Sequence, residues 1–429
     1  MGTNIQEFLE RMASEVQPSP VLSQRLVRKA RRRRARTIVV GLLTVSLVTA
    51  GALYSVRALR AQNTPVPLGP ASCSWTVVPS PNLDPSTRFN WLRDVAVVSD
   101  QDVWAAGIAY IPEGGGGTRS LLLHWDGTAW SIVPHPAGEA DGDLQAVAVS
   151  AANDAWAVGY DGNSGLIEHW DGSTWSVVPA EDPGARYWHF FDVVAVTEED
   201  VWAVGNTATG TSGGTLIEHW DGERWSVVPS PSPEPRPLTS NPYASLLSIA
   251  ARSADDVWAV GQSENVGGNG PSNTLVLHWD GAAWNVVPSS DGDGFQEAPY
   301  DRLLSVAAAP GLKDVWAVGL AGSKGGFGGK SDRALALYFD GTSWTRTSVP
   351  GVWFSSVVST GPDEALAFGS YSGHAVVERW DGTSWQVEEI PVRGTADLSA
   401  GAQAPSGTVW AVGSVTDAGT QETLVLRCA

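Results

Sequence analysis

The sequence predicts an all-β fold, a seven-bladed β-propeller of four-stranded blades at residues 73–429, preceded by one transmembrane helix. The motif DVWAVG occurs in six recognisable copies, and EALAFG at 364–369 is a degraded seventh. A second motif, an apolar run closed by WDGxxW, follows most of them. Repeating units of about 50 residues with several short strands are typical of propeller blades.

Each unit contains four predicted strands. In the first unit they are LRDVAVV at 92–98, the DVWAAG motif, the LLLHW run at 121–125 and the short SIVP segment after WDGTAW. Asp-Gly between two β-rich segments indicates a tight hairpin turn between the third and fourth strands. The well-preserved copies of the first motif are Asp102–Gly107, Asp154–Gly159, Asp200–Gly205, Asp256–Gly261, Asp314–Gly319 and Thr408–Gly413.

Tryptophan marks the framework of the repeat. The chain has 21 Trp, and all but Trp91, Trp188 and Trp353 fall on repeat positions. Large aromatic side chains that recur at one position of every unit are expected to fill the wedge between neighbouring blades. We therefore interpret the recurring tryptophans as packing residues and not as a carbohydrate platform.

The two cysteines are expected to close the ring. The last unit ends at Cys428 without a fourth strand, and CSWTVVPSP at 73–81 supplies a matching strand from the start of the domain. This split blade places Cys73 and Cys428 on either side of the missing hairpin turn. A disulfide there suits hairpin geometry and an oxidising exterior, with two buried free thiols as the alternative.

The N-terminal residues predict a membrane anchor. The run 37–56 carries no charge and is long enough to cross a bilayer, and RKARRRRAR at 28–36 precedes it. This predicts a cytoplasmic segment at 1–36, a transmembrane helix at 37–59, a linker at 60–72 and a propeller outside the cell. A cleaved signal peptide is the alternative.

The segment 4–16 has the apolar spacing of a short amphipathic helix. It is expected to lie on the inner leaflet or to dock a cytoplasmic partner. No Cys or His lies in this region, which excludes a zinc-bearing module there.

Four-stranded units with paired aromatics around a hairpin resemble kelch-type propellers and the related central domain of galactose oxidase. The DVWAVG and WDGTxW repeats look like those of bacterial membrane-anchored propeller proteins without an assigned activity. The resemblance covers 73–429 and implies the fold. It departs from kelch because WAVG carries one Gly where a pair is expected, and the copper site is not carried over because both cysteines are assigned to closure.

Charge narrows the ligand class. Residues 61–429 hold 16 of the 27 Lys and Arg and 43 of the 46 Asp and Glu, a net charge of −27. Such a surface repels phosphate backbones, so nucleic acid is not an expected partner. No cofactor or metal is predicted, since DGDG at 291–294 lacks the EF-hand spacing.

One face of the propeller is expected to bind ligands. The loops that vary between units lie at one end of the blades, at 111–119, 230–245, 263–273, 289–302 and 323–332. At the same end, the residue that begins each innermost strand differs from unit to unit, whereas the residue after it is always apolar. These seven positions, here named the mouth ring, are Trp91, Asp143, His189, Ser245, Arg302, Trp353 and Asp397.

The mixture of aromatic, acidic and basic groups in the mouth ring suits a small-ligand or glycan site, with inert solvated loop ends as the alternative. The predicted function is a non-catalytic, extracytoplasmic binding or scaffolding ectodomain on a bacterial cell membrane, with a glycan, a peptide or another membrane protein as ligand. One alternative is a glycosidase or lyase that uses Asp143 and Asp397 as a carboxylate pair. Another is a transmembrane sensor acting through the N-terminal helix.

Overall fold

The computed structural model describes residues 73–83, 89–111, 117–138, 142–209, 212–232, 243–264, 272–289, 300–322, 333–349 and 353–429. The chain divides into the units Met1–Leu68 and Gly69–Ala429, and only the second contains described residues. Within those ranges no helix is long and apolar enough to span a membrane. The predicted segments 1–36, 37–59 and 60–72 lie outside the described residues, as does most of each variable loop.

The described residues form repeated antiparallel sheets of four strands. The strands of the first four sheets are β2 Phe89–Ser99, β3 Asp102–Ile111, β4 Gly117–Trp125, β5 Trp130–Ile132; β6 Asp143–Ala151, β7 Asp154–Asp161, β8 Ser164–Trp170, β9 Trp175–Val177; β10 Tyr187–Thr197, β11 Asp200–Thr209, β12 Ser212–Trp220, β13 Trp225–Val227; and β14 Tyr243–Ser253, β15 Asp256–Glu264, β16 Ser272–Trp279, β17 Trp284–Val286.

The remaining strands are β18 Tyr300–Ala307, β19 Val315–Gly322, β20 Arg333–Phe339, β21 Trp344–Arg346; β22 Trp353–Gly361, β23 Glu364–Tyr371, β24 His374–Trp380, β25 Trp385–Glu388; and β26 Thr395–Gln403, β27 Val409–Asp417, β28 Thr420–Cys428 with β1 Trp75–Val77. The one short helix in the described part of the chain is the 3-10 turn η2, Pro136–Gly138.

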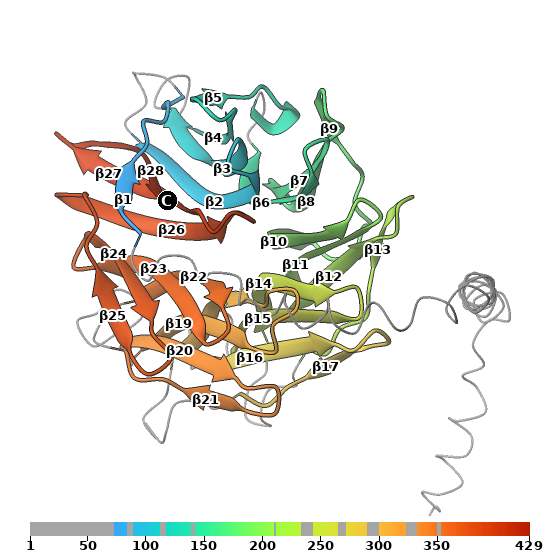
Figure 1. The fold of residues 1–429 in the computed structure, drawn as a ribbon. Coiled ribbons are helices and arrows are strands. Elements are labelled where there is room, and N and C mark those ends of the chain that lie inside the picture. Colours follow the sequence, from blue (N-terminus) through green and yellow to red (C-terminus); the bar gives the residue numbers. More distant parts are fainter. Residues whose placement is uncertain are drawn as a thin grey trace, which may run out of the picture. The chain divides into compact units, whose positions relative to one another are not determined.

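The sheets are the blades of a β-propeller (Figure 1). In each blade the four strands pair in the order of the chain, and β1 completes the last blade by pairing with β28. The first strands of successive blades contact one another, and β26 contacts β2 to close the circle. The first strand of every blade therefore lines the centre, and the short fourth strand lies at the outside.

The Asp-Gly turns join the third and fourth strands as predicted. In the first of them, an oxygen of Asp126 accepts hydrogen bonds from the amides of Thr128 and Ala129, at 2.8 and 2.9 Å. The Thr128 hydroxyl and these amides hold the pKa of Asp126 at about 2. Gly127 follows with a φ of +94°, which residues with a side chain rarely adopt. The repeated Asp-Gly is thus explained by the turn alone.

The recurring tryptophans pack between blades, as the sequence predicts. Trp202 of β11 is 2% exposed, and its ring lies 5.1 Å from that of Trp279 and 5.6 Å from that of Trp284, both in the next blade. The same contact recurs as Trp104 with Trp170 and Trp175, Trp156 with Trp220 and Trp225, Trp258 with Phe339 and Trp344, Trp316 with Trp380 and Trp385, and Trp410 with Trp125 and Trp130.

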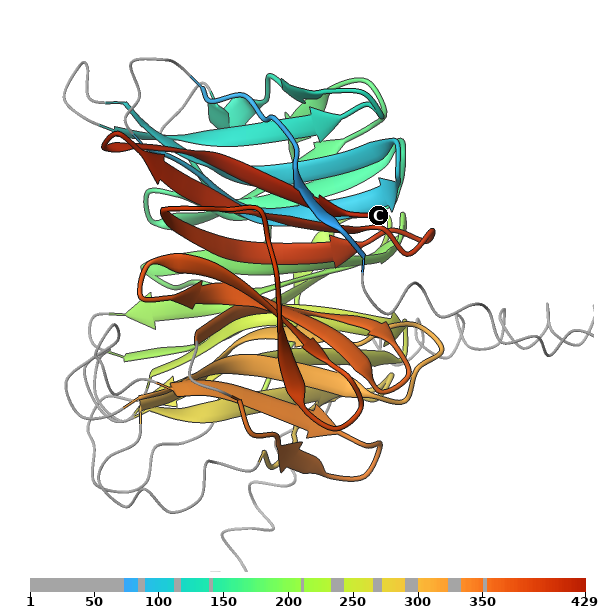
Figure 2. The same cartoon turned by 60° about the vertical axis from the view of Figure 1, so that its left-hand side comes forward.

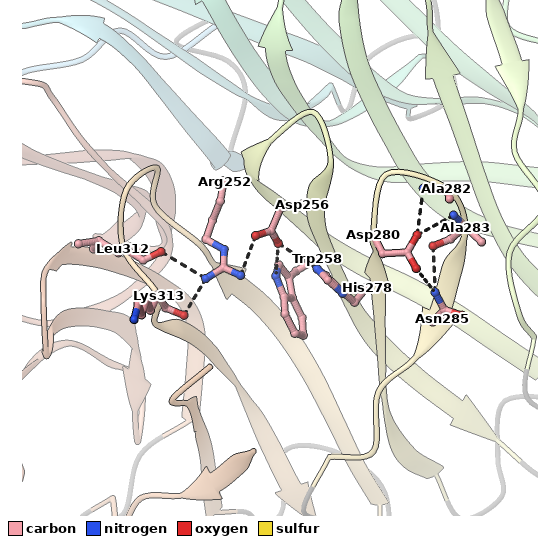
Figure 3. A network of polar contacts seen from close by, with 10 residues as sticks. All are labelled: Arg252, Asp256, Trp258, His278, Asp280, Ala282, Ala283, Asn285, Leu312 and Lys313. Atoms are coloured by element: carbon pink, nitrogen blue, oxygen red, sulfur yellow. Dashed lines mark hydrogen bonds and ion pairs between the residues drawn. The ribbon is translucent and has the colours of Figure 1, made fainter. Parts of the chain in front are cut away.

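Polar contacts also connect neighbouring blades at the end that carries the Asp-Gly turns (Figure 3). Arg252 at the end of β14 donates to the carbonyl oxygens of Leu312 and Lys313, at 3.2 and 2.7 Å, in the next blade. It also forms an ion pair with Asp256, which accepts hydrogen bonds from Trp258 and from the His278 ring. The histidine before WDG is therefore held by an aspartate of its own blade.

A disulfide joins Cys73 to Cys428, as predicted, with 5.4 Å between the two Cα atoms. Trp75 pairs with Cys428 in the register that joins Trp130 to Trp125 in another blade, so Cys428 takes the place of a framework tryptophan. The neighbouring blade has Leu366 where others have tryptophan, and Leu366, Trp75 and Cys428 share one core cluster. The disulfide therefore lies at the interface between the last two blades, where the framework tryptophans are replaced by Leu366 and Cys428.

Candidate functional site

The strand register places the mouth-ring residues at equivalent positions. Each lies near the beginning of the first strand of its blade and pairs with the residue that follows the glycine of the WAVG motif. The pairs are Trp91–Ile108, Asp143–Tyr160, His189–Asn206, Ser245–Gln262, Arg302–Leu320, Trp353–Ser370 and Asp397–Ser414. The alignment made from the sequence is therefore the alignment of the strands.

The glycine of the WAVG motif is required because it lies against the backbone of the mouth-ring residue. A Cβ atom on Gly205 would lie 1.8 Å from the carbonyl oxygen of His189, and the corresponding glycines of the other blades face the same obstruction. Two residues after each mouth-ring residue, the first strand has an irregularity in its register, a β-bulge. The bulge residues are Arg93, Gln145, Phe191, Leu247, Leu304, Ser355 and Ser399.

The mouth-ring side chains differ in access to solvent. Trp353 is 38% exposed, whereas Asp143 is 8% and Ser245 is 2% exposed. Trp91, His189, Arg302 and Asp397 are half-buried. Equivalent backbone positions therefore do not give an evenly exposed ring.

A polar network begins at Asp143. Arg93, from the bulge of β2, forms an ion pair with this carboxylate, and its guanidinium carbon lies 5.3 Å from the centre of the Trp91 ring. Gln145 donates to the same carboxylate at 2.6 Å and the Tyr160 hydroxyl at 3.1 Å. The charge of Asp143 is thus neutralised by a neighbouring blade.

The network continues to the next blade through two stacked rings. Tyr160 lies parallel to His189 with 4.1 Å between ring centres, and the imidazole contacts the carbonyl oxygen of Gly162 at 3.3 Å. Burial and the charge of Asp143 raise the pKa of Tyr160, and burial lowers the pKa of His189. Both groups are therefore held largely neutral near neutral pH.

Asp397 has a different set of partners. The hydroxyls of Ser414 and Ser399 donate to its carboxylate, at 2.6 and 3.4 Å. Ser399 also accepts a hydrogen bond from the indole of Trp91 at 2.6 Å. Burial raises the pKa of Asp397, since these hydroxyls and the indole of Trp91 offset only part of the cost of removing the charge from water.

Asp143 and Asp397 lie in the two blades on either side of the blade that carries Trp91 and Arg93. Arg93 forms an ion pair with Asp143, and the indole of Trp91 is a hydrogen-bond partner of Asp397. The carboxylate of Asp143 is thus held by a charged partner, whereas the partners of Asp397 are neutral hydrogen-bond donors.

A small cavity lies on the propeller axis below the ring. Its volume is about 110 Å³, and the bulge residues and the residues after them line it. Asp94, Asp192, Ser248, Ser305 and Ser356 stand after bulge residues in their blades and accept hydrogen bonds from backbone amides of the next blade. The equivalent residues in the other two first strands are Ala146 and Ala400.

Asp94 and Asp192 lie in the two blades that come directly after the blades with these alanines. An alanine side chain cannot accept a hydrogen bond from the next blade, and each aspartate accepts that bond from an amide of its own strand instead. Asp192 accepts from the amides of both Val193 and Ile249, each at 2.8 Å. Asp94 likewise binds the amides of Val95 and Val147. Burial raises the pKa of both aspartates, and their mutual repulsion adds to the rise at Asp94. These carboxylates join the first strands together and were not found from the sequence.

The described residues contain one group of metal-ligand type, Cys73, Glu388 and Cys428. Its two sulfurs are bonded to each other, and Glu388 accepts hydrogen bonds from Trp75 and Arg379, at 2.6 and 2.5 Å. The group therefore serves the closure of the last blade.

No protein-family model matches the chain, and no curated protein matches its sequence. Solved structures match its fold. YCF48 bound to a D1 peptide has a TM-score of 0.51 at 15% identity, over 83% of this chain and 96% of that one. YCF48 from Cyanidioschyzon merolae has a TM-score of 0.51 at 14% identity, over 83% and 98%. The polysaccharide lyase Uly1 has a TM-score of 0.52 at 11% identity, over 83% and 97%. At these identities the likeness establishes the fold, a β-propeller.

Proposed function

We propose that this chain is a non-catalytic binding protein of the cell surface, with a seven-bladed, kelch-like propeller at 73–429 and a transmembrane anchor at 37–59. The N-terminus lies in the cytoplasm and the propeller outside. The ligand binds at the end of the blades that carries the mouth ring, and a peptide or protein is the favoured class. The arginine cluster at 28–36, next to an uncharged run of bilayer length, supports this topology.

One observation carries the assignment of the binding face. Equivalent positions in the body of the propeller repeat the same residue type, but the seven mouth-ring positions hold five residue types, among them the exposed Trp353. The backbone there is fixed by the glycine contact and the bulge, so the fold requires no particular side chain. Chemically diverse groups on a rigid scaffold are typical of a binding site.

The closing disulfide lies at the end of the blades away from the mouth ring. Cys73 is bonded to the last residue of β28, at the end of the blades that carries the Asp-Gly turns. The mouth ring lies at the opposite end of the same blade, since Asp397 pairs with Ser414 near the end of β27, whereas Cys428 pairs with Val409 at its beginning. Figure 2 shows the blades from the side.

The binding face is tested with peptide and glycan arrays probed with the full-length chain in detergent micelles. Trp353→Ala should abolish the signal that the wild type gives. Val387→Ala, which removes a 67% exposed apolar side chain from the outer strand β25, should not change it. Equal signals from wild type and Trp353→Ala on every probe would contradict the proposal.

The topology is tested with protease added to intact cells. The propeller should be removed, leaving a short membrane-bound N-terminal fragment. Complete protection of the propeller would contradict the topology, and release of a mature soluble form starting near residue 55 would identify a signal peptide.

A further inference from the structure

The mouth ring contains the same aromatic and acidic pair twice. Trp91 on β2 is followed at the next ring position by Asp143 on β6, and Trp353 on β22 is followed by Asp397 on β26. Strands β2 and β6 contact each other, as do β22 and β26. The two pairs therefore have equivalent backbone settings in different parts of the ring.

The first pair encloses a cation that the protein supplies itself. Arg93, the bulge residue of β2, lies over the Trp91 ring and forms an ion pair with Asp143. Its guanidinium also donates to the carbonyl oxygen of Leu144 at 3.3 Å. The arginine and aspartate side chains are only 16% and 11% exposed, so the contact is shielded from water. An aromatic face and a carboxylate together suit a planar guanidinium.

The second pair lacks such a cation. The bulge residue of β22 is Ser355, whose side chain is too short to lie over Trp353 and reach Asp397. Within the part of the chain that the structure describes, no Lys, Arg or His side chain forms an ion pair with Asp397. Its partners are the hydroxyls of Ser414 and Ser399 and the indole of Trp91, all of which are neutral.

The aromatic half of the second pair is both fixed and accessible. The indole of Trp353 donates to the hydroxyl of Ser370 at 2.8 Å, which orients the ring, and 38% of the residue is exposed. Among the described residues, Asp397 is therefore a half-buried carboxylate without a cationic partner, at the ring position next to an exposed indole. The burial of Asp397, which raises its pKa, makes a cation more favourable there than at an open surface.

We propose that Trp353 and Asp397 bind an arginine side chain of a polypeptide partner, in the place that Arg93 occupies between Trp91 and Asp143. This rests on the proposed function of the mouth as a binding face. The net charge of −27 over residues 61–429 attracts a cationic partner and repels an anionic one. Lysine and the amine of an amino sugar supply the charge without the planar fork, so they should bind more weakly.

An engineered arginine tests whether a guanidinium can bind between Trp353 and Asp397. Ser355→Arg in the full-length chain should copy Arg93, raise the melting temperature and lose that gain when Asp397→Asn is added. Ser355→Gln is the uncharged control and should give no gain. A melting temperature that changes by the same amount with and without Asp397→Asn would contradict the geometry.

Peptide binding tests the ligand class independently of that variant. A glycine-flanked peptide with one arginine is compared with the same peptide carrying citrulline or lysine and with an amino-sugar oligomer, on the full-length chain. We expect the arginine peptide to bind about tenfold or more tightly than the citrulline peptide, as loss of a charge-assisted contact predicts. The preference should disappear in Asp397→Asn and persist in Asp417→Asn, which removes an exposed acid from the same blade.

The outcomes separate the two proposals. If the citrulline peptide or a neutral glycan binds as tightly as the arginine peptide, and Trp353→Ala abolishes that binding, the mouth is a binding site but the arginine proposal is wrong. If the amino-sugar oligomer exceeds the arginine peptide, the cation comes from a glycan and the polypeptide partner is wrong. If no binding depends on Trp353, the proposed function is wrong as well.

Discussion

Tryptophan has opposite roles in two regions of this propeller. Between blades, Trp104, Trp202 and their equivalents are about 2% exposed or less, and each contacts aromatic rings of the next blade. At the mouth, Trp353 is 38% exposed and packs into no such aromatic cluster among the described residues. The interface between blades recurs around the ring, and nearly every blade has the same side chain there, with Leu366 as the exception. The mouth positions share a backbone but have no common packing requirement.

Repetition in this propeller separates residues that the fold requires from residues that it does not. A residue type that recurs in nearly every unit reports a requirement of the fold, as with the Asp-Gly turn. A residue type found in only one or two units, on a backbone that all units share, is not required by the fold. The following predictions test this distinction, beginning with the framework.

Loss of the closing disulfide should have the largest effect on stability. Cys73 and Cys428 are separated by 355 residues, and closing so long a loop stabilises the fold by about 4–6 kcal/mol on the chain-entropy estimate. Cys428→Ser should therefore lower the free energy of unfolding by several kcal/mol, measured by denaturant titration under non-reducing conditions. The fold should persist at room temperature because β1 still pairs with β28.

Cys73→Ser is the matched control and should give the same loss. A change below about 1 kcal/mol in both variants would show that closure depends on strand pairing and packing instead.

Removal of a framework tryptophan should cause the second-largest loss of stability. Trp202→Ala leaves a cavity beside Trp279 and Trp284 and should cost about 3–5 kcal/mol in the free energy of unfolding. Denaturant unfolding followed by circular dichroism measures it. A cost below about 1 kcal/mol would mean that neighbouring blades move together to fill the space.

A buried glutamate should make stability depend on pH. Glu378 of β24 is 0% exposed, and within the described residues no donor reaches its carboxylate, so burial raises its pKa to about 7. A pKa raised by folding means that the stabilising protonated form is fully present below about pH 4.5 and is lost as the pH rises through about 7. Equivalent positions in other blades hold Leu123, Leu277, Leu337 and Leu426.

Glu378→Leu should therefore increase the free energy of unfolding at pH 8 by on the order of 2 kcal/mol and reduce its fall between pH 5 and pH 8. Melting curves across this range measure both effects. Glu168→Leu is the contrasting control and should destabilise, because Glu168 accepts hydrogen bonds from His135 and from the amide of Ala137, at 2.8 and 2.6 Å. An unchanged pH profile in Glu378→Leu would contradict the assignment.

Much of the fold was predictable from the sequence because it repeats. The strand pattern, the Asp-Gly turn and the tryptophan packing depend on contacts that occur in nearly every unit. The split blade and the Cys73–Cys428 bond were predictable because a unit without its last strand leaves only one partner. The register of the mouth ring was predictable by counting back from a framework residue.

The chemistry of the site was only partly predictable. The alternation of a strand predicts which residues share a face, but a β-bulge interrupts it two residues after the ring position. Arg93 and Ser399 therefore contact ring residues although their position in the sequence suggests no special role. Counting two residues beyond each ring position would have found them. Asp94 replaces an acceptor that the alanine of the preceding blade lacks. This relation can be predicted only when the order of the blades in space is known.

The most direct test of the account compares two tryptophan variants, Trp353→Ala and Trp202→Ala, in the same denaturant titration and on the same binding arrays. Because Trp353 is partly exposed, its removal should cost less than about 1 kcal/mol of unfolding free energy but abolish ligand binding. Trp202→Ala should cost about 3–5 kcal/mol and, at temperatures where it is folded, bind normally. Equal losses of stability in the two variants, or normal binding by Trp353→Ala, would contradict the claim that the mouth ring is a binding site and not a part of the packing.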